Sequence, residues 1–225
     1  RLLSITGYSE AQSAGRRLEA RNGQVLTGID VLEKENFAPL KQGREKITIG
    51  VLTNQTGLDA QGNRTLDALA AAPGVKVAAI FSPEHGINGN VDTTAIDNSV
   101  DSATGATVYS MYGGTDAKRR PPVDVLKTLD AIVVDIQDAG ARFYTYETTL
   151  GYVLEAAAEA GIEVVVLDRP NPITGSFVQG PVSEAARQSF TNYHPVPVRH
   201  GMTMGELAQM FNAERKIGAK MRVVA

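Results

Sequence analysis

The sequence contains no cysteine and no tryptophan, and only three of its 225 residues are histidine. The lack of cysteine excludes disulfide bonds and thiolate metal sites, although it leaves the cellular compartment open. No apolar run approaches the roughly 18 residues that a membrane-spanning helix needs. The formal net charge of −3 at pH 7 lacks the basic excess that nucleic-acid binding usually requires, so we expect neither a membrane span nor a nucleic-acid partner.

What is present is the composition of a globular protein, with 43% hydrophobic and 21% charged residues. A chain of this length can bury a sizeable core as one large domain. Residues 1–24 are polar and only weakly helical, so we expect a poorly ordered leader or linker there and a folded domain over residues 25–225. The chain begins with Arg1 and ends in "AKMRVVA", a run typical of a β-strand. Both ends favour a piece of a longer protein, from which a signal peptide could already be missing.

Short apolar runs alternate with amphipathic segments from residue 25 onward. Continuous apolar strands separated by helices are typical of a parallel sheet covered on both faces, so the sequence predicts a doubly wound, mostly parallel, Rossmann-like α/β fold. In such folds ligands bind outside the carboxyl ends of the strands, where the strand order reverses. The predicted strands span residues 46–52, 75–81, 106–112, 130–136 and 162–168, with a last one in the final run, and the predicted helices span residues 64–72, 121–129, 146–160 and 204–215.

Local signals mark the ends of these helices. An apolar stripe from Leu150 to Ala157 follows helical spacing, and Gly161 comes where a helix is expected to end. Thr203 and Glu206 have the spacing of a capping box at the start of the last helix. The second predicted helix opens on proline, whose missing N–H costs nothing in a first turn.

Polar side chains gather where the predicted strands end. One such cluster is typical of an ordinary loop, but four at one edge of a sheet favour a polar cleft over decorated turns. The residues are Thr53, Asn54, Gln55 and Thr56 after the first strand, Ser82, Glu84 and His85 after the second, Asp135, Gln137, Asp138 and Arg142 after the fourth, and Asp168, Arg169 and Asn171 after the fifth.

The usual motifs of cofactor and hydrolase sites are absent. The sequence has no glycine-rich G-x-G-x-x-G turn after the first strand and no G-x-x-x-x-G-K-[ST] loop, so neither NAD nor ATP is supported. It has no G-x-S-x-G nucleophile elbow, and Glu84–His85 are adjacent rather than spaced as in H-E-x-x-H. We therefore expect no cofactor and no metal.

The remaining carboxylates, amides, tyrosines and arginines suit a polyhydroxylated substrate. Glycoside hydrolysis needs a carboxylic acid to protonate the leaving oxygen, and often a second carboxylate. Glu84 is the best candidate for the acid, because Pro83 and Gly86 constrain its turn and a partly apolar site would raise its pKa. The alternative is a solvated turn glutamate. His85 could orient Glu84, bind substrate or only cap the loop.

The other candidates carry open alternatives. Asp135, Asp138 and Asp168 compete for the second carboxylate, although an aspartate at a strand end often only accepts backbone N–H bonds. The binding candidates could each be structural instead, in turns, core contacts, surface ion pairs or a helix entry. They are Asn54 and Gln137 for sugar hydroxyls, Tyr144 and Tyr146 for stacking on a sugar, Arg142, Arg169 and Arg199 for a substrate carboxylate, and His200.

Several long motifs in order resemble one family. These motifs are "VLTGIDVLEKENFAPLKQ", "IGVLTNQTG", "FSPEHGI", "DIQDAGARFYTY", "VLDRPNPITG" and "VRHGMTMGELA". Over about residues 25–225 the chain resembles the NamZ-type exo-β-N-acetylmuramidases of glycoside hydrolase family 171, formerly a domain family of unknown function. The resemblance implies a bacterial enzyme that removes β-1,4-linked N-acetylmuramic acid from non-reducing ends of peptidoglycan fragments, and hence a secreted or periplasmic location.

The resemblance also implies roles for residues. Glu84 in "SPEHG" is the implied catalytic acid with His85 beside it, and Asn54, Asp168 and Asn171 are implied to line the cleft together with the "DIQD" and "RFYTY" segments. The family adds a smaller C-terminal domain that completes the cleft and lies beyond this sequence. The mechanism stays open between retention, inversion and use of the substrate's acetamido group as nucleophile.

Two other classes of function stay open. One is a non-catalytic module that binds sugars or muropeptides in the same cleft. The other is a metal-dependent hydrolase that uses Glu84, His85 and Asp135.

Overall fold

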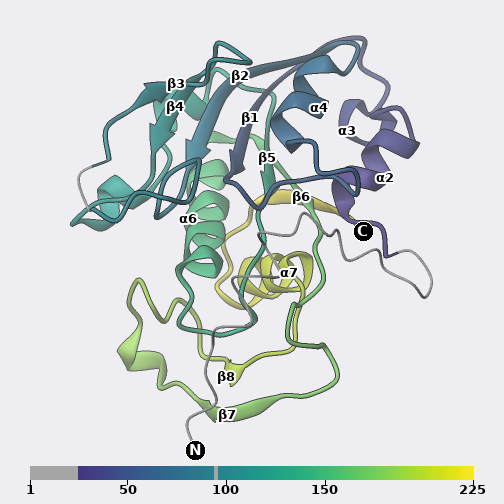
Figure 1. The fold of residues 1–225 in the computed structure, drawn as a ribbon. Helices are drawn as coiled ribbons and strands as arrows, with labels where there is room; N and C mark the ends of the chain where they lie inside the picture. Colours follow the sequence, from purple (N-terminus) through teal and green to yellow (C-terminus); the bar gives the residue numbers. More distant parts are fainter. Residues whose placement is uncertain (1–24, 94–95) are drawn as a thin grey trace, which may run out of the picture.

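The computed structural model describes residues 25–93 and 96–225, which form a three-layer α/β fold around one seven-stranded sheet (Figure 1). The strand order is β3-β4-β2-β1-β5-β6-β9, in which β3 is antiparallel and the six others are parallel. This confirms the predicted doubly wound, mostly parallel architecture. The strands are β1 (Ile47–Thr53), β2 (Val75–Ser82), β3 (Ser99–Val100), β4 (Thr107–Ser110), β5 (Ala131–Asp135), β6 (Glu163–Leu167) and β9 (Lys220–Val224).

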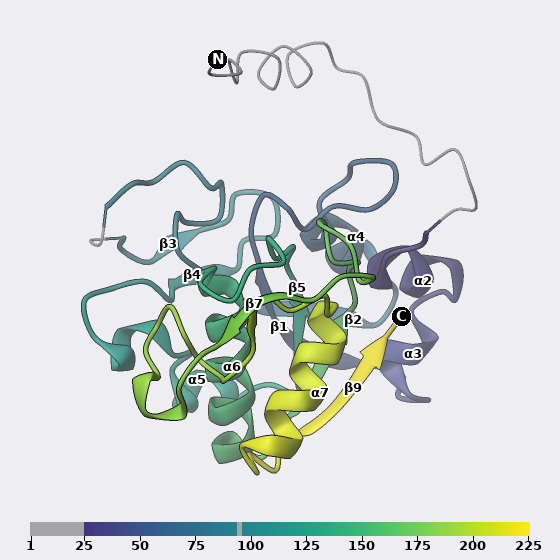
Figure 2. The same ribbon diagram turned by 90° about the horizontal axis from the view of Figure 1, so that it is seen from below.

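Helices cover both faces of this sheet. Val51 pairs in register with Ile80 on β2 and Val133 on β5, and all three pack against the first helix group. Because side chains alternate along a strand, Leu52 and its partners on the adjacent strands, Phe81 and Val134, point to the opposite face, toward the second group. Figures 1 and 2 show the first group together, apart from α6 and α7. The first group is α2 (Gly28–Lys34), α3 (Ala38–Lys41) and α4 (Thr65–Ala71), and the second is α5 (Val123–Leu126), α6 (Thr145–Ala160) and α7 (Met204–Glu214).

Most predicted elements are present at nearly the predicted positions. Gly161 ends α6 with a φ of 75°, and Thr203 and Glu206 form the predicted capping box of α7. One prediction is wrong, namely that proline lies in the first turn of the second helix. Helix α5 begins at Val123, and Pro122 is the N-cap residue before it. The segment predicted as a leader, residues 1–24, lies outside the described residues.

The sequence patterns did not predict the short elements. α2 and α3 are only one or two turns long, so periodicity has too few residues to show in them. The strand pair β7 (Gln179–Val182) and β8 (Pro197–Arg199) contains proline and glycine, which sequence reasoning treats as loop signals. Two 3₁₀ turns, Asp116–Arg119 and Ala185–Arg187, were likewise not predicted.

The β7–β8 pair lies apart from the main sheet, below it in Figure 1, and its backbone is tied to the loop after β5. Arg142 donates from its backbone N–H to Val198 and from its guanidinium to the carbonyls of Pro181 and Val196, at 2.8 and 2.6 Å. Val182 on β7 is 58% exposed, so this strand pair lies at the surface.

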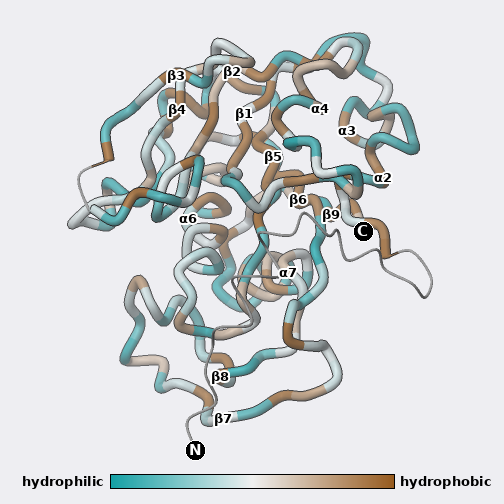
Figure 3. The backbone as a smooth tube through the Cα atoms, viewed as in Figure 1, coloured by the Kyte–Doolittle hydropathy of each residue, from teal (hydrophilic) through white to brown (hydrophobic). Residues whose placement is uncertain are grey.

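The hydropathy of the residues follows the fold. In Figure 3 the strands of the sheet are mostly brown, which marks hydrophobic residues, and the connecting loops are mostly teal or white.

The strand order reverses beside β1. The chain passes from β1 to β2 on one side, whereas β5, on the other side of β1, continues to β6 and β9. Loops that leave β1 and β5 at their carboxyl ends therefore diverge, which opens the sheet edge at this point. No helix within residues 25–93 and 96–225 is long and apolar enough to cross a membrane.

Candidate active site

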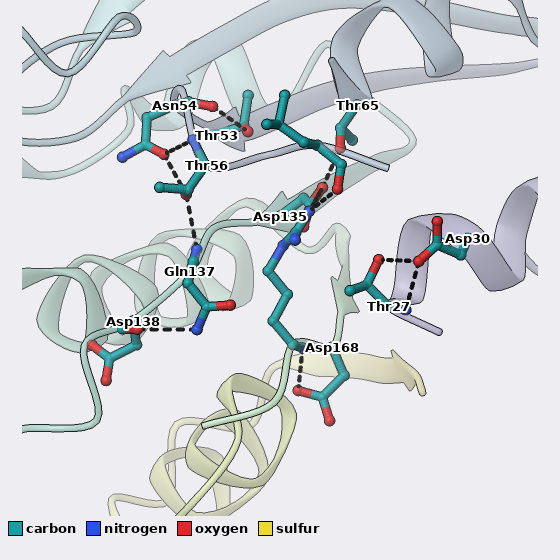
Figure 4. A network of polar contacts seen from close by, with 12 residues as sticks. Thr27, Asp30, Thr53, Asn54, Thr56, Thr65, Asp135, Gln137, Asp138 and Asp168 are labelled. Carbon is teal, nitrogen blue, oxygen red and sulfur yellow. Dashed lines mark hydrogen bonds and ion pairs between the residues drawn. The ribbon is translucent and has the colours of Figure 1, made fainter. Parts of the chain in front are cut away.

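A buried ion pair occupies the point where the strand order reverses (Figure 4). Arg169 donates from Nε to Asp135 Oδ1 at 2.6 Å and from Nη2 to Asp135 Oδ2 at 3.0 Å. The Thr65 hydroxyl donates to the same carboxylate, and Arg169 also donates to the carbonyl of Leu58. Both side chains are almost completely buried. Asp135 thus lies at the predicted sheet edge, but its two oxygens are already occupied, which suits a supporting role better than that of second carboxylate.

Asp168 is used as a helix cap. Its Oδ1 accepts from the backbone N–H of Gly205 at 2.7 Å and from that of Arg169 at 2.9 Å. Its Oδ2 accepts from the Thr203 hydroxyl at 2.8 Å. The carboxylate therefore satisfies orphan donors at the start of α7 and holds that helix on the end of β6.

The amide residues form one chain of hydrogen bonds across the loops after β1 and β5. Asn54 Oδ1 accepts from the backbone and hydroxyl of Thr56, at 2.9 and 2.6 Å, and the Thr56 hydroxyl accepts from the backbone N–H of Gln137. Gln137 Nε2 donates to the carbonyls of Asp138 and Pro170. The Asn54 amide nitrogen is buried, and a hydrogen bond from the Asn54 side chain lowers the pKa of the Tyr146 hydroxyl against the larger effect of burial.

Glu84 lies directly after β2 in a half-buried turn. Its Oε2 accepts a hydrogen bond of 2.6 Å from the hydroxyl of Thr145, and its carbonyl accepts from the hydroxyl of Tyr146 at 3.4 Å. The hydrogen bond to Glu84 and, after it, burial raise the pKa of the Tyr112 hydroxyl. Groups from β2, from the loop after β4 and from the first turn of α6 therefore converge on this carboxyl group.

His85 has the left-handed φ of 71°, and its side chain is exposed. Its Nδ1 lies 3.2 Å from the carbonyl of Val91 within the same loop. The metal-ligand trio considered from sequence does not form, because no three His, Asp or Glu side chains within residues 25–93 and 96–225 are placed to hold a metal ion together.

The two tyrosines differ in access. Tyr144 and Tyr146 make an edge-to-face contact with ring centroids 4.7 Å apart. Tyr146 is only 2% exposed, and burial is the main cause that raises its pKa. Tyr146 thus belongs to the core beneath Glu84, whereas the half-buried Tyr144 retains an accessible side.

The candidate arginines are already hydrogen-bonded. Arg169 is neutralised by Asp135, and Arg142 holds the carbonyls of the β7–β8 pair. Arg199 donates to the Gln179 amide oxygen at 2.9 Å and to the carbonyl of Ile173, and it is only partly buried. Asn171 accepts from Ile173 and donates to Met202, so it shapes the turn beside them.

Two of the residues named from sequence, Asp138 and His200, lie in a buried cluster with Glu147, which sequence reasoning missed. Glu147 on α6 has a fully buried side chain, and its Oε2 lies 3.8 Å from Nε2 of His200. The same nitrogen lies 3.5 Å from Oδ2 of Asp138. Desolvation and then the charge of Asp138 raise the pKa of Glu147 to about 9, against a lowering by Arg142.

A signal for Glu147 does exist in the sequence. Glu147 lies three residues before Leu150 and seven before Leu154, in register with the apolar stripe of α6. A glutamate in an apolar stripe is a candidate for a buried acid, because charged residues are rarely fully buried unless they are paired or neutral.

Comparisons with known proteins identify the family of this chain. A sequence model of the family described as "Exo-beta-N-acetylmuramidase NamZ, N-terminal" matches residues 49–225. The chain belongs to the NamZ family. Within the family, the chain is 41% identical over 222 residues to the peptidoglycan beta-N-acetylmuramidase NamZ of Bacillus subtilis (strain 168), covering 98% of this chain and 52% of that protein.

Two crystal structures of DUF1343 family proteins from Bacteroides fragilis NCTC 9343 have the same fold as this NamZ-family chain. The protein BF0371 is 42% identical with a TM-score of 0.79, and the match covers 89% of this chain and 49% of that one. The protein BF0379 is 33% identical with a TM-score of 0.73, and the match covers 90% and 52%. The chain therefore spans about half the length of the relatives it matches.

Proposed function

We propose that this protein is an exo-acting glycoside hydrolase that removes terminal β-1,4-linked N-acetylmuramic acid from peptidoglycan fragments, with Glu84 as the general acid. The relative from Bacillus subtilis is named as a peptidoglycan beta-N-acetylmuramidase, which supports the substrate class. We also propose a secreted or periplasmic location, because peptidoglycan lies outside the cytoplasmic membrane. The second half of the relatives' length would complete the cleft above the sheet edge.

The observation that carries the proposal is the setting of Glu84. It is a half-buried carboxyl group at the carboxyl end of a central parallel strand, and the Thr145 hydroxyl donates to one of its two oxygens. The hydroxyl groups of Thr145 and Tyr112 both interact with this carboxyl group, so they would orient it toward the leaving glycosidic oxygen that needs its proton.

The hydrogen bonds that Asp135 and Asp168 already accept make both residues poor candidates for the second catalytic carboxylate. Each carboxylate is saturated by cations or by N–H and O–H donors. Asp138, the third candidate, is buried and accepts from the backbone N–H of Gly140. One enzymic acid and an orienting carboxylate suffice when the 2-acetamido group of the substrate acts as nucleophile, and we favour that substrate-assisted course. Asn54 and Gln137 would bind sugar hydroxyls or the acetamido group. Among the three arginines, Arg199 is our choice for the lactyl carboxylate, because Arg169 is neutralised by Asp135 and Arg142 makes a part-buried hydrogen bond to Val196, whereas the hydrogen bond from Arg199 to Gln179 is exposed.

The test is turnover of a chromogenic β-N-acetylmuraminide by the full-length protein. We expect Glu84→Gln to lower kcat by about 10²- to 10⁴-fold, because general acid catalysis contributes about that much. Gln can still accept the hydrogen bond from Thr145, so binding of a muramic-acid disaccharide in calorimetry should persist. Glu45→Gln, a change of an exposed side chain, is the matched control.

Unchanged turnover in the Glu84→Gln variant would exclude Glu84 as the acid. Binding of the disaccharide without any release of product by the wild type would instead support the non-catalytic binding module.

A further inference from the structure

The buried cluster of Glu147, Asp138 and His200 joins three separate segments of the chain. Glu147 is the third residue of α6, Asp138 lies in the loop between β5 and α6, and His200 lies in the loop between β8 and α7. All three residues are at most 5% exposed. None of them is saturated, because Asp138 Oδ1, both carboxyl oxygens of Glu147 and His200 Nε2 have no hydrogen-bond partner among the described residues.

The hydrogen bonds that do exist decide where the protons lie. His200 Nδ1 accepts from the backbone N–H of Met202 at 3.1 Å, so the neutral ring carries its proton on Nε2, between the two carboxyl groups. Asp138 Oδ2 accepts from the backbone N–H of Gly140 at 2.5 Å. Burial and the charge of Asp138 oppose ionisation of the Glu147 carboxyl group, and the charge of Arg142 offsets them only in part.

Glu147 does not perform the usual task of a glutamate in this position. The third residue of a helix commonly returns its carboxylate to the N-cap backbone or stabilises the helix dipole as an anion. Here the side chain of the N-cap residue Tyr144 makes no capping hydrogen bond, and the carboxyl group of Glu147 points into the interior. A buried, unpaired acid in a helix entry is costly, so it is a candidate for a function.

The first turn of α6 connects this cluster to the acid. Thr145 and Tyr146 precede Glu147 directly, and both donate to Glu84, one to its carboxyl group and one to its carbonyl. Any shift of this turn therefore moves the groups that aim the Glu84 carboxyl group. Displacements of about 1 Å at a catalytic group cost roughly 10²-fold in rate.

We propose that Glu147 is a positioning residue, which stays protonated and, shared between Asp138 and His200, anchors the first turn of α6 so that Thr145 and Tyr146 hold Glu84 in place. This inference rests on the proposed function for its catalytic part, whereas the protonation of Glu147 can be measured without substrate. Because the three side chains are at most 5% exposed, the role is one of positioning and not of contact with the substrate.

The first experiment detects the proton. At pH 7 the infrared spectrum of the wild type should contain the carbonyl band of a protonated carboxylic acid, and Glu147→Gln should remove it. Glu159→Gln, which changes an exposed glutamate on the same helix, should leave the band unchanged. A wild-type spectrum without a band that depends on Glu147 would overturn the proposal, and the glycosidase assignment would stand.

The second experiment measures positioning in the full-length protein with the chromogenic muraminide. Glu147→Ala should lower kcat by about 10²-fold and change KM by less than about threefold, because Glu84 is misplaced while the sugar contacts remain. Glu147→Gln keeps the shape of the side chain and supplies an N–H donor, so its kcat should lie within about fivefold of the wild-type value. Full kcat in the alanine variant would overturn the positioning role. Lack of turnover in the wild type would reject the proposed function and the positioning role together. The infrared result would still show whether Glu147 is protonated.

Discussion

The ion pair of Arg169 and Asp135 shows how much a single residue depends on its partner here. Both side chains are buried, and the carboxylate receives two hydrogen bonds from the guanidinium. Removing one member of such a pair leaves a charge in the interior without compensation. The pair joins the end of β5 to the loop after β6, so it also supports the sheet edge on which the candidate site lies.

We predict that Arg169→Met lowers the free energy of unfolding by about 3–5 kcal/mol, because Asp135 stays buried and loses its counterion. Urea-induced unfolding would measure the change. Arg44→Met is the control: its salt bridge to Asp130, at 3.6 Å, joins two side chains that are about half exposed, and such pairs contribute about 0–1 kcal/mol. Equal effects of the two changes would show that burial of the first pair has no energetic consequence.

At the scale of the element, α2 shows how closely a short helix approaches the sheet. The first residue of α2, Gly28, donates its N–H to the carbonyl of Asp168 at 2.8 Å. A Cβ at this position would lie 2.5 Å from backbone atoms of Leu167, Asp168 and Val224. Thr27 and Asp30 hold the start of the helix through a capping box. The glycine is therefore needed for close approach to β6 and β9.

Gly28→Ala should destabilise the fold by about 1–3 kcal/mol or more, because the clash is with backbone atoms, which cannot turn aside as a side chain can. A thermal unfolding scan would record the loss as a lower Tm. Gly114→Ala should have little effect, since a Cβ there meets no atom within 4 Å. An unchanged Tm in the Gly28 variant would mean that α2 can shift away from the sheet without cost.

At the scale of the whole molecule, two buried acids with opposite pKa shifts determine how stability depends on pH. Hydrogen bonds from Arg64, which outweigh burial, lower the pKa of Asp101 to about 2 and connect α4 to the antiparallel edge of the sheet. The stabilisation from Asp101 is present above its unfolded value and is lost as the pH falls toward 2. Burial raises the pKa of Glu147 to about 9, so the folded state holds a proton that the unfolded chain has lost.

We therefore predict that the free energy of unfolding decreases as pH rises from about 4.5 toward 9. Between these values the folded state binds more protons at Glu147 than the unfolded state, which costs about 3 kcal/mol by pH 7. Urea unfolding at a series of pH values would measure the slope. Glu147→Gln should flatten it, whereas Glu159→Gln should not. The same slope in wild type and in Glu147→Gln would show that Glu147 ionises in the folded protein.

The sequence by itself determined the sheet and its main helices, because each depends on a local pattern. Runs such as 130–136 are apolar on both faces, and the helix at Leu150 repeats its apolar residues at helical spacing, so burial on two sides follows from the order of residues alone. The polar strand ends were visible for the same reason, and the resemblance of whole motifs to the NamZ family needed no coordinates.

Only the tertiary structure decided which of the polar residues are already in use. Asp168 caps α7, Asp135 neutralises Arg169, and Arg142 holds a strand pair that no local pattern predicted. Each of these partners lies more than 30 residues away along the chain, so sequence spacing contains no sign of them. The same holds for Glu147, whose buried carboxyl group meets His200 only because β8 and α7 return to the entry of α6. Whether a carboxyl group is free, paired or protonated depends on charges and burial that the folded chain brings together.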